Sequence, residues 1–221
     1  MSASEQPQLD IGRAGVSAHH QHEQRRANRE KQVHDKHPGV GGPLLAVGDG
    51  SERESVRACG AGAEEHAGKV LARCLHDGVV VLHDRRIPRS RVNIDHIAVA
   101  RSGIWVIDSE RYTGKVAISK PLFGKVKLTI AGRDKTKLVE SLTKQLALAE
   151  AVMPDIAPGV PVRGALCFVE ADLPVLGRLA FNGYPLLSTT SLAKCINANG
   201  PITEEDVPVI AAQIAERFPL A

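Results

Sequence analysis

Aromatic side chains are scarce in this sequence, where they make up 3% of 221 residues. Proteins that hold single strands by base stacking depend on such side chains, so a stacking platform is disfavoured, although binding to the backbone alone needs none. No apolar run approaches the roughly 18 residues of a transmembrane helix, and the polar residues 1–10 lack the apolar core of a signal peptide. We therefore expect a cytoplasmic protein that does not bind a membrane.

Cysteine is also sparse and has no spacing typical of a metal site. The four cysteines, at positions 59, 74, 167 and 195, form no CxxC pair, so we expect reduced thiols rather than a zinc finger. No Walker loop or Rossmann glycine fingerprint is found either. These absences disfavour the common nucleotide-binding and dinucleotide-binding folds.

What the sequence does contain is a β-hairpin that carries acidic residues. Two apolar, β-rich runs, residues 93–100 and 104–111, flank a Ser-Gly turn. If Ser102 and Gly103 form a two-residue loop, Asp95 lies opposite Glu110 and Asp108 lies opposite Ile97. Side chains alternate between faces along a strand, so the three carboxylates are predicted on one face.

Like charges that face each other across a strand pair destabilise it, so this cluster favours a bound cation. An oxygen-only ligand set favours Mg²⁺ or Mn²⁺ over zinc. The alternative is an acidic sheet edge neutralised by nearby Arg or Lys. Asp108 argues against that alternative because it ends the run Ile104–Ile107, which is apolar on both faces as in a buried strand.

The remaining pattern predicts a mixed α/β sandwich around one sheet. Residues 1–40 form a polar extension that we expect to be disordered or a solvated helix, residues 41–185 a core, and residues 186–221 a helical tail packed on that core. Helices are expected from about residue 63, over 136–153 and up to Glu216, and Tyr112-Thr113-Gly114 is expected to break the strand that follows the hairpin.

Basic residues surround the acidic cluster. Eight Lys and Arg side chains lie between residues 111 and 137, while the net charge of the whole chain is only +3. A basic surround with an acidic centre suits a phosphodiester backbone held over a metal site, and an ordinary solvated lysine face explains the charges equally well. Arg89, Arg91 and Lys115 are the candidate phosphate contacts by position.

Several short motifs, taken in order, resemble a known family, the nuclease-related domain or NERD. They are Gly60-Ala61-Gly62-Ala63-Glu64, Leu82-His83-Asp84-Arg85-Arg86-Ile87-Pro88, Asn93-Ile94-Asp95-His96, Gly103 through Asp108, and Tyr112-x-Gly114. The resemblance covers about residues 40 to 170. It implies a branch of the PD-(D/E)xK nuclease superfamily, with the restriction-endonuclease-like fold of a mixed central sheet flanked by helices.

The resemblance also implies site residues. By position Glu64 matches the family's helix glutamate, Asp95 its first aspartate, Asp108 the acidic residue of its second motif, and Gln145 a helix glutamine. Gln145 also falls on the apolar stripe of the predicted helix, where an inward amide needs a hydrogen-bond partner in the site or in the core. The predicted catalytic residues are Glu64, Asp95, Asp108, Glu110 and Gln145, and all but Gln145 are predicted metal ligands.

One position departs from the family pattern, because Glu110 stands where the second motif has lysine. Glu110 would then act as a base or as a further metal ligand, and Lys115 or Lys127 would supply an ammonium from elsewhere. Loss of a general acid or base typically costs about 10²- to 10⁴-fold in rate. We expect Mg²⁺- or Mn²⁺-dependent hydrolysis of DNA. The alternatives are an impaired module that binds nucleic acid or protein without turnover, and an interaction domain in which the carboxylates only form ion pairs.

Overall fold

The computed structural model describes residues 9–16, 62, 64–90, 92–174 and 177–221. Its framework is an eight-stranded mixed sheet with the path β1-β2-β3-β6-β8-β7, from which β4 and β5 branch at the far end of β3. Strand β3 pairs in parallel with β6, and β6 with β8; the other pairs are antiparallel. The strands are β1 (Val80–Arg86), β2 (Asn93–Ala100), β3 (Gly103–Ser119), β4 (Lys127–Ile130), β5 (Arg133–Asp134), β6 (Val162–Asp172), β7 (Ala180–Phe181) and β8 (Tyr184–Ser188).

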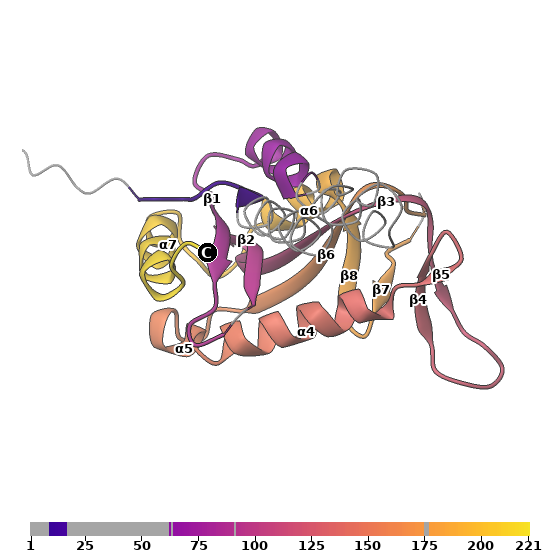
Figure 1. The fold of residues 1–221 in the computed structure, drawn as a ribbon. Helices are drawn as coiled ribbons and strands as arrows, with labels where there is room; N and C mark the ends of the chain where they lie inside the picture. Colours follow the sequence, from indigo (N-terminus) through magenta and orange to yellow (C-terminus); the bar gives the residue numbers. More distant parts are fainter. Residues whose placement is uncertain (1–8, 17–61, 63, 91, 175–176) are drawn as a thin grey trace, which may run out of the picture.

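Helices cover both faces of this sheet (Figure 1). The helix over residues 64–74 packs with α6 (Thr189–Ile196) against one face, which includes Ala98 and Ile107. Helices α4 (Thr136–Glu150), α5 (Met153–Ile156) and α7 (Asp206–Arg217) pack against the other face, which includes Ile97 and Val106. The predicted α/β class with a mixed sheet flanked by helices is confirmed.

The central hairpin forms, but its register differs from the predicted one by two residues. Ala100 pairs with Gly103, so Arg101 and Ser102 form the loop. The reason is that Ser102 is buried, where its Oγ donates to Ile196 O (2.8 Å) and accepts from Trp105 Nε1 (2.9 Å). Gly103 has φ +130° and begins the strand beside Pro161, whose carbonyl oxygen would lie 2.7 Å from an added Cβ.

A shift of two residues changes the partners but not the faces. Continued beyond His96 and Ile107, the observed register sets Asp95 opposite Asp108 instead of Glu110. At this position Asp95 Oδ2 accepts a hydrogen bond from the backbone N–H of Ser109 at 2.8 Å. The predicted opposition of Asp95 and Glu110 was wrong, while the three carboxylates keep the common face that alternation gives them.

Strand β3 does not end at the predicted break. It continues to Ser119, and only its register against β6 shifts, between Arg111 and Gly114. An irregularity of this kind re-aims a strand without ending it. As a result the second half of β3 pairs with β4 and leaves the main sheet as a hairpin arm (Figure 1).

Both ends of the described chain hydrogen bond to β1. Ile11 O accepts from His83 N (2.8 Å), and Ala221 N donates to Asp84 O (3.1 Å). Residues 9–16 of the predicted extension therefore lie against the sheet, while its other residues fall outside the described part. In the predicted tail, β8 crosses the expected boundary at residue 185 and joins the sheet. Thr203 Oγ1 accepts a hydrogen bond from Asp206 N (3.2 Å) at the start of α7.

Within the described ranges, every helix is too short or too polar to cross a lipid bilayer.

Candidate functional site

The acidic site begins where the buried run of β3 ends. Asp108 is 8% exposed and follows Ile104, Val106 and Ile107 at 0%. Burial raises the pKa of Asp108 to about 6, and a hydrogen bond with Asp95 opposes that rise. The two aspartates of neighbouring strands therefore interact directly, through the observed register and not the predicted one.

Asp95 on β2 and Glu110 on β3 belong to the same acidic cluster as Asp108. Burial, and then the charges of Glu64, Asp108 and Glu110, raise the pKa of Asp95 well above its usual range, against the hydrogen bond from Ser109. Burial and Asp108 likewise raise the pKa of Glu110 to about 8. The carboxylates from β2 and β3 thus lie close enough to resist ionising together.

Glu64 reaches the same cluster from the helix over residues 64–74. Burial raises its pKa to about 8, with further contributions from the charges of Asp84 and Asp108, while a backbone hydrogen bond from Gly15 acts in the opposite direction. Glu64 is 31 positions from Asp95 in sequence, so only the fold explains this proximity. The structure brings together all four residues that the sequence predicts as metal ligands.

Asp84 is a fifth acidic residue, which the sequence reasoning missed. The register of β1 on β2 sets His83 opposite His96 and Arg85 opposite Ile94, so Asp84 falls opposite Asp95. Asp84 is 4% exposed and has φ +51°, a conformation that non-glycine residues adopt rarely and often at functional sites. The available signal was its position inside the motif that begins Leu82-His83-Asp84.

A positive charge reaches Glu110 from Lys135, one of the basic residues expected around the cluster but not the one expected to supply the ammonium. Lys135 lowers the pKa of Glu110 against burial and Asp108. Its Nζ lies 4.6 Å from the ring centroid of Tyr112, which is two residues beyond Glu110 on β3. The two predicted lysines lie differently: Lys127 Nζ pairs with Asp134 Oδ2 at 3.0 Å, and Lys115 is exposed on the arm.

Gln145 lies on the buried face of α4, as predicted. It is 4% exposed, and its Oε1 finds no hydrogen-bond partner among the described groups. A buried acceptor without a partner is costly, by about 1–3 kcal/mol, and in native proteins such atoms call for an explanation. The position of Gln145 is confirmed, and its role in the site stays a prediction.

The carboxylates are neighbours but do not form a ready-made cage. Among the described residues, no three His, Cys, Asp or Glu side chains are arranged to hold a metal ion as they stand. The donors fit Mg²⁺ or Mn²⁺ by chemistry, because all of them are oxygens and a divalent cation offsets the mutual repulsion that, after burial, raises their pKa values.

The predicted phosphate contacts are less informative. Arg89 is an exposed loop residue with φ +59°, Lys115 is exposed, and Arg91 lies outside the described residues.

His96, expected to be a core or hydrogen-bonded histidine, is fully buried with its Nδ1 2.8 Å from that of His83. Burial and then His83 lower the pKa of His96 to about 3, so it stays neutral.

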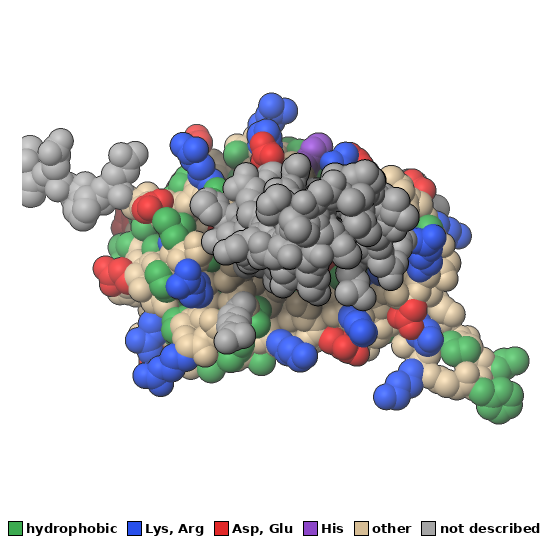
Figure 2. Space-filling model, viewed as in Figure 1, with side chains coloured by type: hydrophobic (Ala, Val, Ile, Leu, Met, Phe, Trp, Pro, Cys, Tyr) green, Lys and Arg blue, Asp and Glu red, His purple; other side chains and the backbone are tan. Residues whose placement is uncertain are grey.

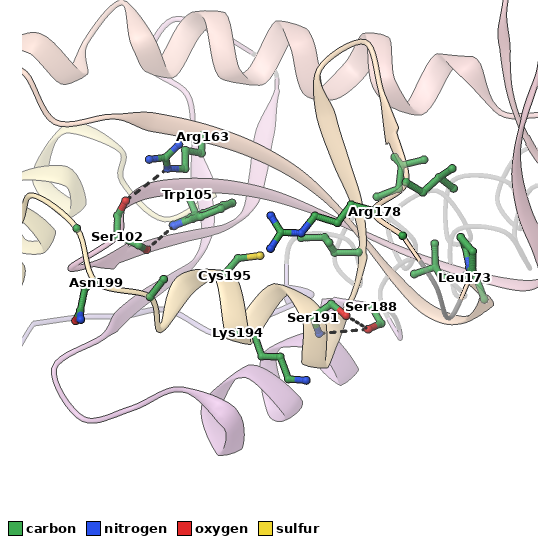
Figure 3. A pocket seen from close by; sticks show the side chains of 18 residues that line it. Ser102, Trp105, Arg163, Leu173, Arg178, Ser188, Ser191, Lys194, Cys195 and Asn199 are labelled. Carbon is green, nitrogen blue, oxygen red and sulfur yellow. Dashed lines mark hydrogen bonds between the residues drawn. The ribbon is translucent and has the colours of Figure 1, made fainter.

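A separate groove of about 750 Å³ lies along α6 (Figure 3). Trp105, Arg163, Arg178 and Lys194 line it, and none of the predicted site residues does. The Arg163 guanidinium lies 5.7 Å from the Trp105 ring centroid. This groove is therefore separate from the acidic cluster.

Comparison with known proteins gives one match. Residues 60–169 match the model of a family described as the nuclease-related domain, NERD. No curated protein and no solved structure matches the chain. The matched segment contains every residue of the acidic cluster, together with Lys135 and Gln145.

Proposed function

From the premise that this chain carries a nuclease-related domain at residues 60–169, we propose that it hydrolyses phosphodiester bonds of DNA with the help of Mg²⁺ or Mn²⁺. The observation that carries the proposal is the mutual electrostatic effect of Glu64, Asp95, Asp108 and Glu110 at the end of two buried strands. Buried carboxylates with strongly raised pKa values are typical of functional sites.

Glu64, Asp95, Asp108 and Glu110 would hold the ion. When bound, a divalent ion polarises the scissile phosphate and lowers the pKa of a water molecule. The resident carboxylates must lose their protons to bind it, and their buried strands limit how far the backbone moves. Asp84, opposite Asp95 on β1, adds negative charge to the same place and strengthens the attraction for a cation.

Lys135 would contact the phosphate, and Gln145 would contact the attacking water. Lys135 carries the ammonium that acts on Glu110, and we infer that it takes over the charge supplied by the motif lysine in other members of the family. The Oε1 atom of Gln145 has a free acceptor site in the described structure, which an attacking water would fill by donating a hydrogen bond.

A second function is favoured by one residue. Glu110 replaces the lysine of the family motif, and a site without that lysine would bind an ion and nucleic acid but turn over slowly or not at all. Membership of the family is compatible with either outcome, because a fold hosts both active and inactive sites.

Cleavage assays separate the two functions. Purified protein is incubated with plasmid and single-stranded DNA in Mg²⁺, Mn²⁺ or EDTA, beside Asp108→Asn and a matched control, Asp77→Asn, which changes an exposed aspartate. The nuclease proposal expects metal-dependent cleavage that Asp108→Asn lowers roughly 100-fold or more and Asp77→Asn leaves unchanged. Absent cleavage with retained DNA binding supports the impaired module, and cleavage insensitive to Asp108→Asn refutes the assigned site.

A further inference from the structure

The hairpin arm ends in two apolar side chains that are almost fully exposed. Leu122 is 98% and Phe123 is 94% exposed, and the sequence across the tip is Lys120-Pro121-Leu122-Phe123-Gly124-Lys125. Figure 2 shows hydrophobic side chains gathered at the far end of the arm, away from the body of the protein. Exposed apolar side chains that are grouped in this way often mark an interaction site.

The base of the arm is packed. Val116, Leu128 and Ile130 are at most 2% exposed, and Thr129 Oγ1 donates to Ala117 O at 3.2 Å. Lys127 Nζ pairs with Asp134 Oδ2 (3.0 Å) where β4 meets β5. The tip is therefore held out on an ordered support, which favours a contact at a defined position over adventitious stickiness.

The arm also has a fixed relation to the acidic cluster, because both are built on β3. From Asp108 to the end of the strand at Ser119 there are 11 residue steps, 119 minus 108. At about 3.3 Å per step, a straight strand would reach at most about 36 Å at Ser119, and the irregularity between Arg111 and Gly114 shortens that reach. The spacing is of the same order as one turn of B-DNA, roughly 34–36 Å, so a duplex lying over the acidic cluster is long enough to reach the tip as well.

We propose that the tip of the β3–β4 arm is a DNA wedge: Leu122 and Phe123 insert between stacked bases, and Lys120 and Lys125 contact the phosphates on either side. Apolar wedges of Leu or Phe next to basic side chains are a recurrent way for proteins to unstack and kink a duplex. The inference rests on the proposed function for its partner. The position of the tip on the strand of the acidic cluster favours DNA over a lipid surface.

The first test measures unstacking in the absence of cleavage. The probe is a duplex with 2-aminopurine at successive positions, mixed with Asp108→Asn protein in EDTA. The tip variant Leu122→Ser/Phe123→Ser is compared with Val209→Ser, which alters an apolar side chain of α7 that is 56% exposed. Since the tip side chains are almost fully exposed, the variant keeps its fold, which circular dichroism verifies.

The wedge predicts a rise in fluorescence at one position. The tip variant should lose this rise and bind DNA at least about 10-fold more weakly, while Val209→Ser should retain both the rise and the affinity. Lys120→Gln/Lys125→Gln lowers the slope of log affinity against log salt by about 2. Unchanged fluorescence and affinity in the tip variant overturn the wedge. So does tip-dependent sedimentation with anionic vesicles, or a tip-dependent change in oligomeric state, when DNA binding is unaffected.

The same experiments separate the wedge from the nuclease proposal. Tip-dependent unstacking by a wild-type protein that does not cleave supports the wedge and refutes the nuclease activity. Cleavage at full rate by the tip variant, with no unstacking by either protein, supports the nuclease and refutes the wedge.

Discussion

Metal binding by this protein should depend steeply on pH. Burial, and after it the charges of neighbouring carboxylates, raise the pKa values of Glu64 and Glu110 to about 8 and that of Asp95 well above its usual range, and burial raises the pKa of Asp108 to about 6. A divalent ion binds the ionised forms, so it must displace the protons that these groups carry at lower pH. Its affinity is therefore expected to increase as the pH rises from about 6 to about 8.

The size of the effect follows from the two glutamates. Each proton released below a pKa of about 8 costs about 1.36 kcal/mol per pH unit, or a factor of ten in affinity. If both glutamates ligate the ion, affinity rises by about two decades per unit well below pH 8, and by somewhat more than 10³-fold between pH 6 and pH 8, where each glutamate is half ionised. Above pH 8 the curve flattens, because little proton remains to be displaced.

Calorimetric titration with Mn²⁺ measures both affinity and protons released, when it is repeated in buffers of different ionisation enthalpy. At pH 7 the two glutamates of the wild type should release close to two protons, beside the contribution of Asp95, and Glu64→Gln should release about one proton fewer. The exposed control Glu150→Gln should behave as wild type. Affinity that is independent of pH between 6 and 8, or binding without proton release, would refute this reasoning.

Four further outcomes are expected. Glu110→Lys, assayed for DNA cleavage, should increase the rate if the natural site is impaired and decrease it, by about 10²-fold or more, if Glu110 acts as ligand or base. Lys135→Gln should lower cleavage by a similar factor and raise the pKa of Glu110 further, whereas Lys144→Gln, an exposed change on α4, should do neither. Glu110→Gln should stabilise the metal-free protein above pH 8. A carboxyl whose pKa is higher in the folded state than in the unfolded state costs stability as the pH rises through the folded value. Removing about 1 kcal/mol of this cost should raise Tm by about 2–4 °C in thermal melts. Gly103→Ala should lower Tm, because it places a Cβ 2.7 Å from Pro161 O at φ +130°, and an unchanged melting curve would show that the strand start relaxes freely.

The central part of the fold was predictable because its signals are local. The alternation of apolar residues along 93–111 predicts two strands and their faces, and these hold even though the loop lies at Arg101-Ser102. The register depended on the burial of Ser102 against α6, a contact with a helix some 90 residues away, which no local pattern contains. The error of two residues left the faces intact, so the acidic cluster was still predicted on one side.

The carboxylates that gather in the acidic cluster could be predicted, and their surroundings could not. Glu64 joins Asp95 and Asp108 as the family resemblance implies, and Gln145 is buried on the stripe where helical periodicity places it. Asp84 and Lys135 were missed because their roles follow from tertiary contacts: Asp84 is opposite Asp95 through the β1–β2 register, and Lys135 meets Tyr112 through the turn before α4. Neither relation has a spacing that can be read from the chain.

Anomalous scattering from a crystal soaked in Mn²⁺ would test the central claim most directly. We predict one strong peak with oxygen ligands from Glu64, Asp95 and Asp108 at about 2.0–2.3 Å, and its loss in Asp108→Asn crystals. A fully soaked crystal with no peak among these carboxylates, or with manganese bound only elsewhere, would contradict it.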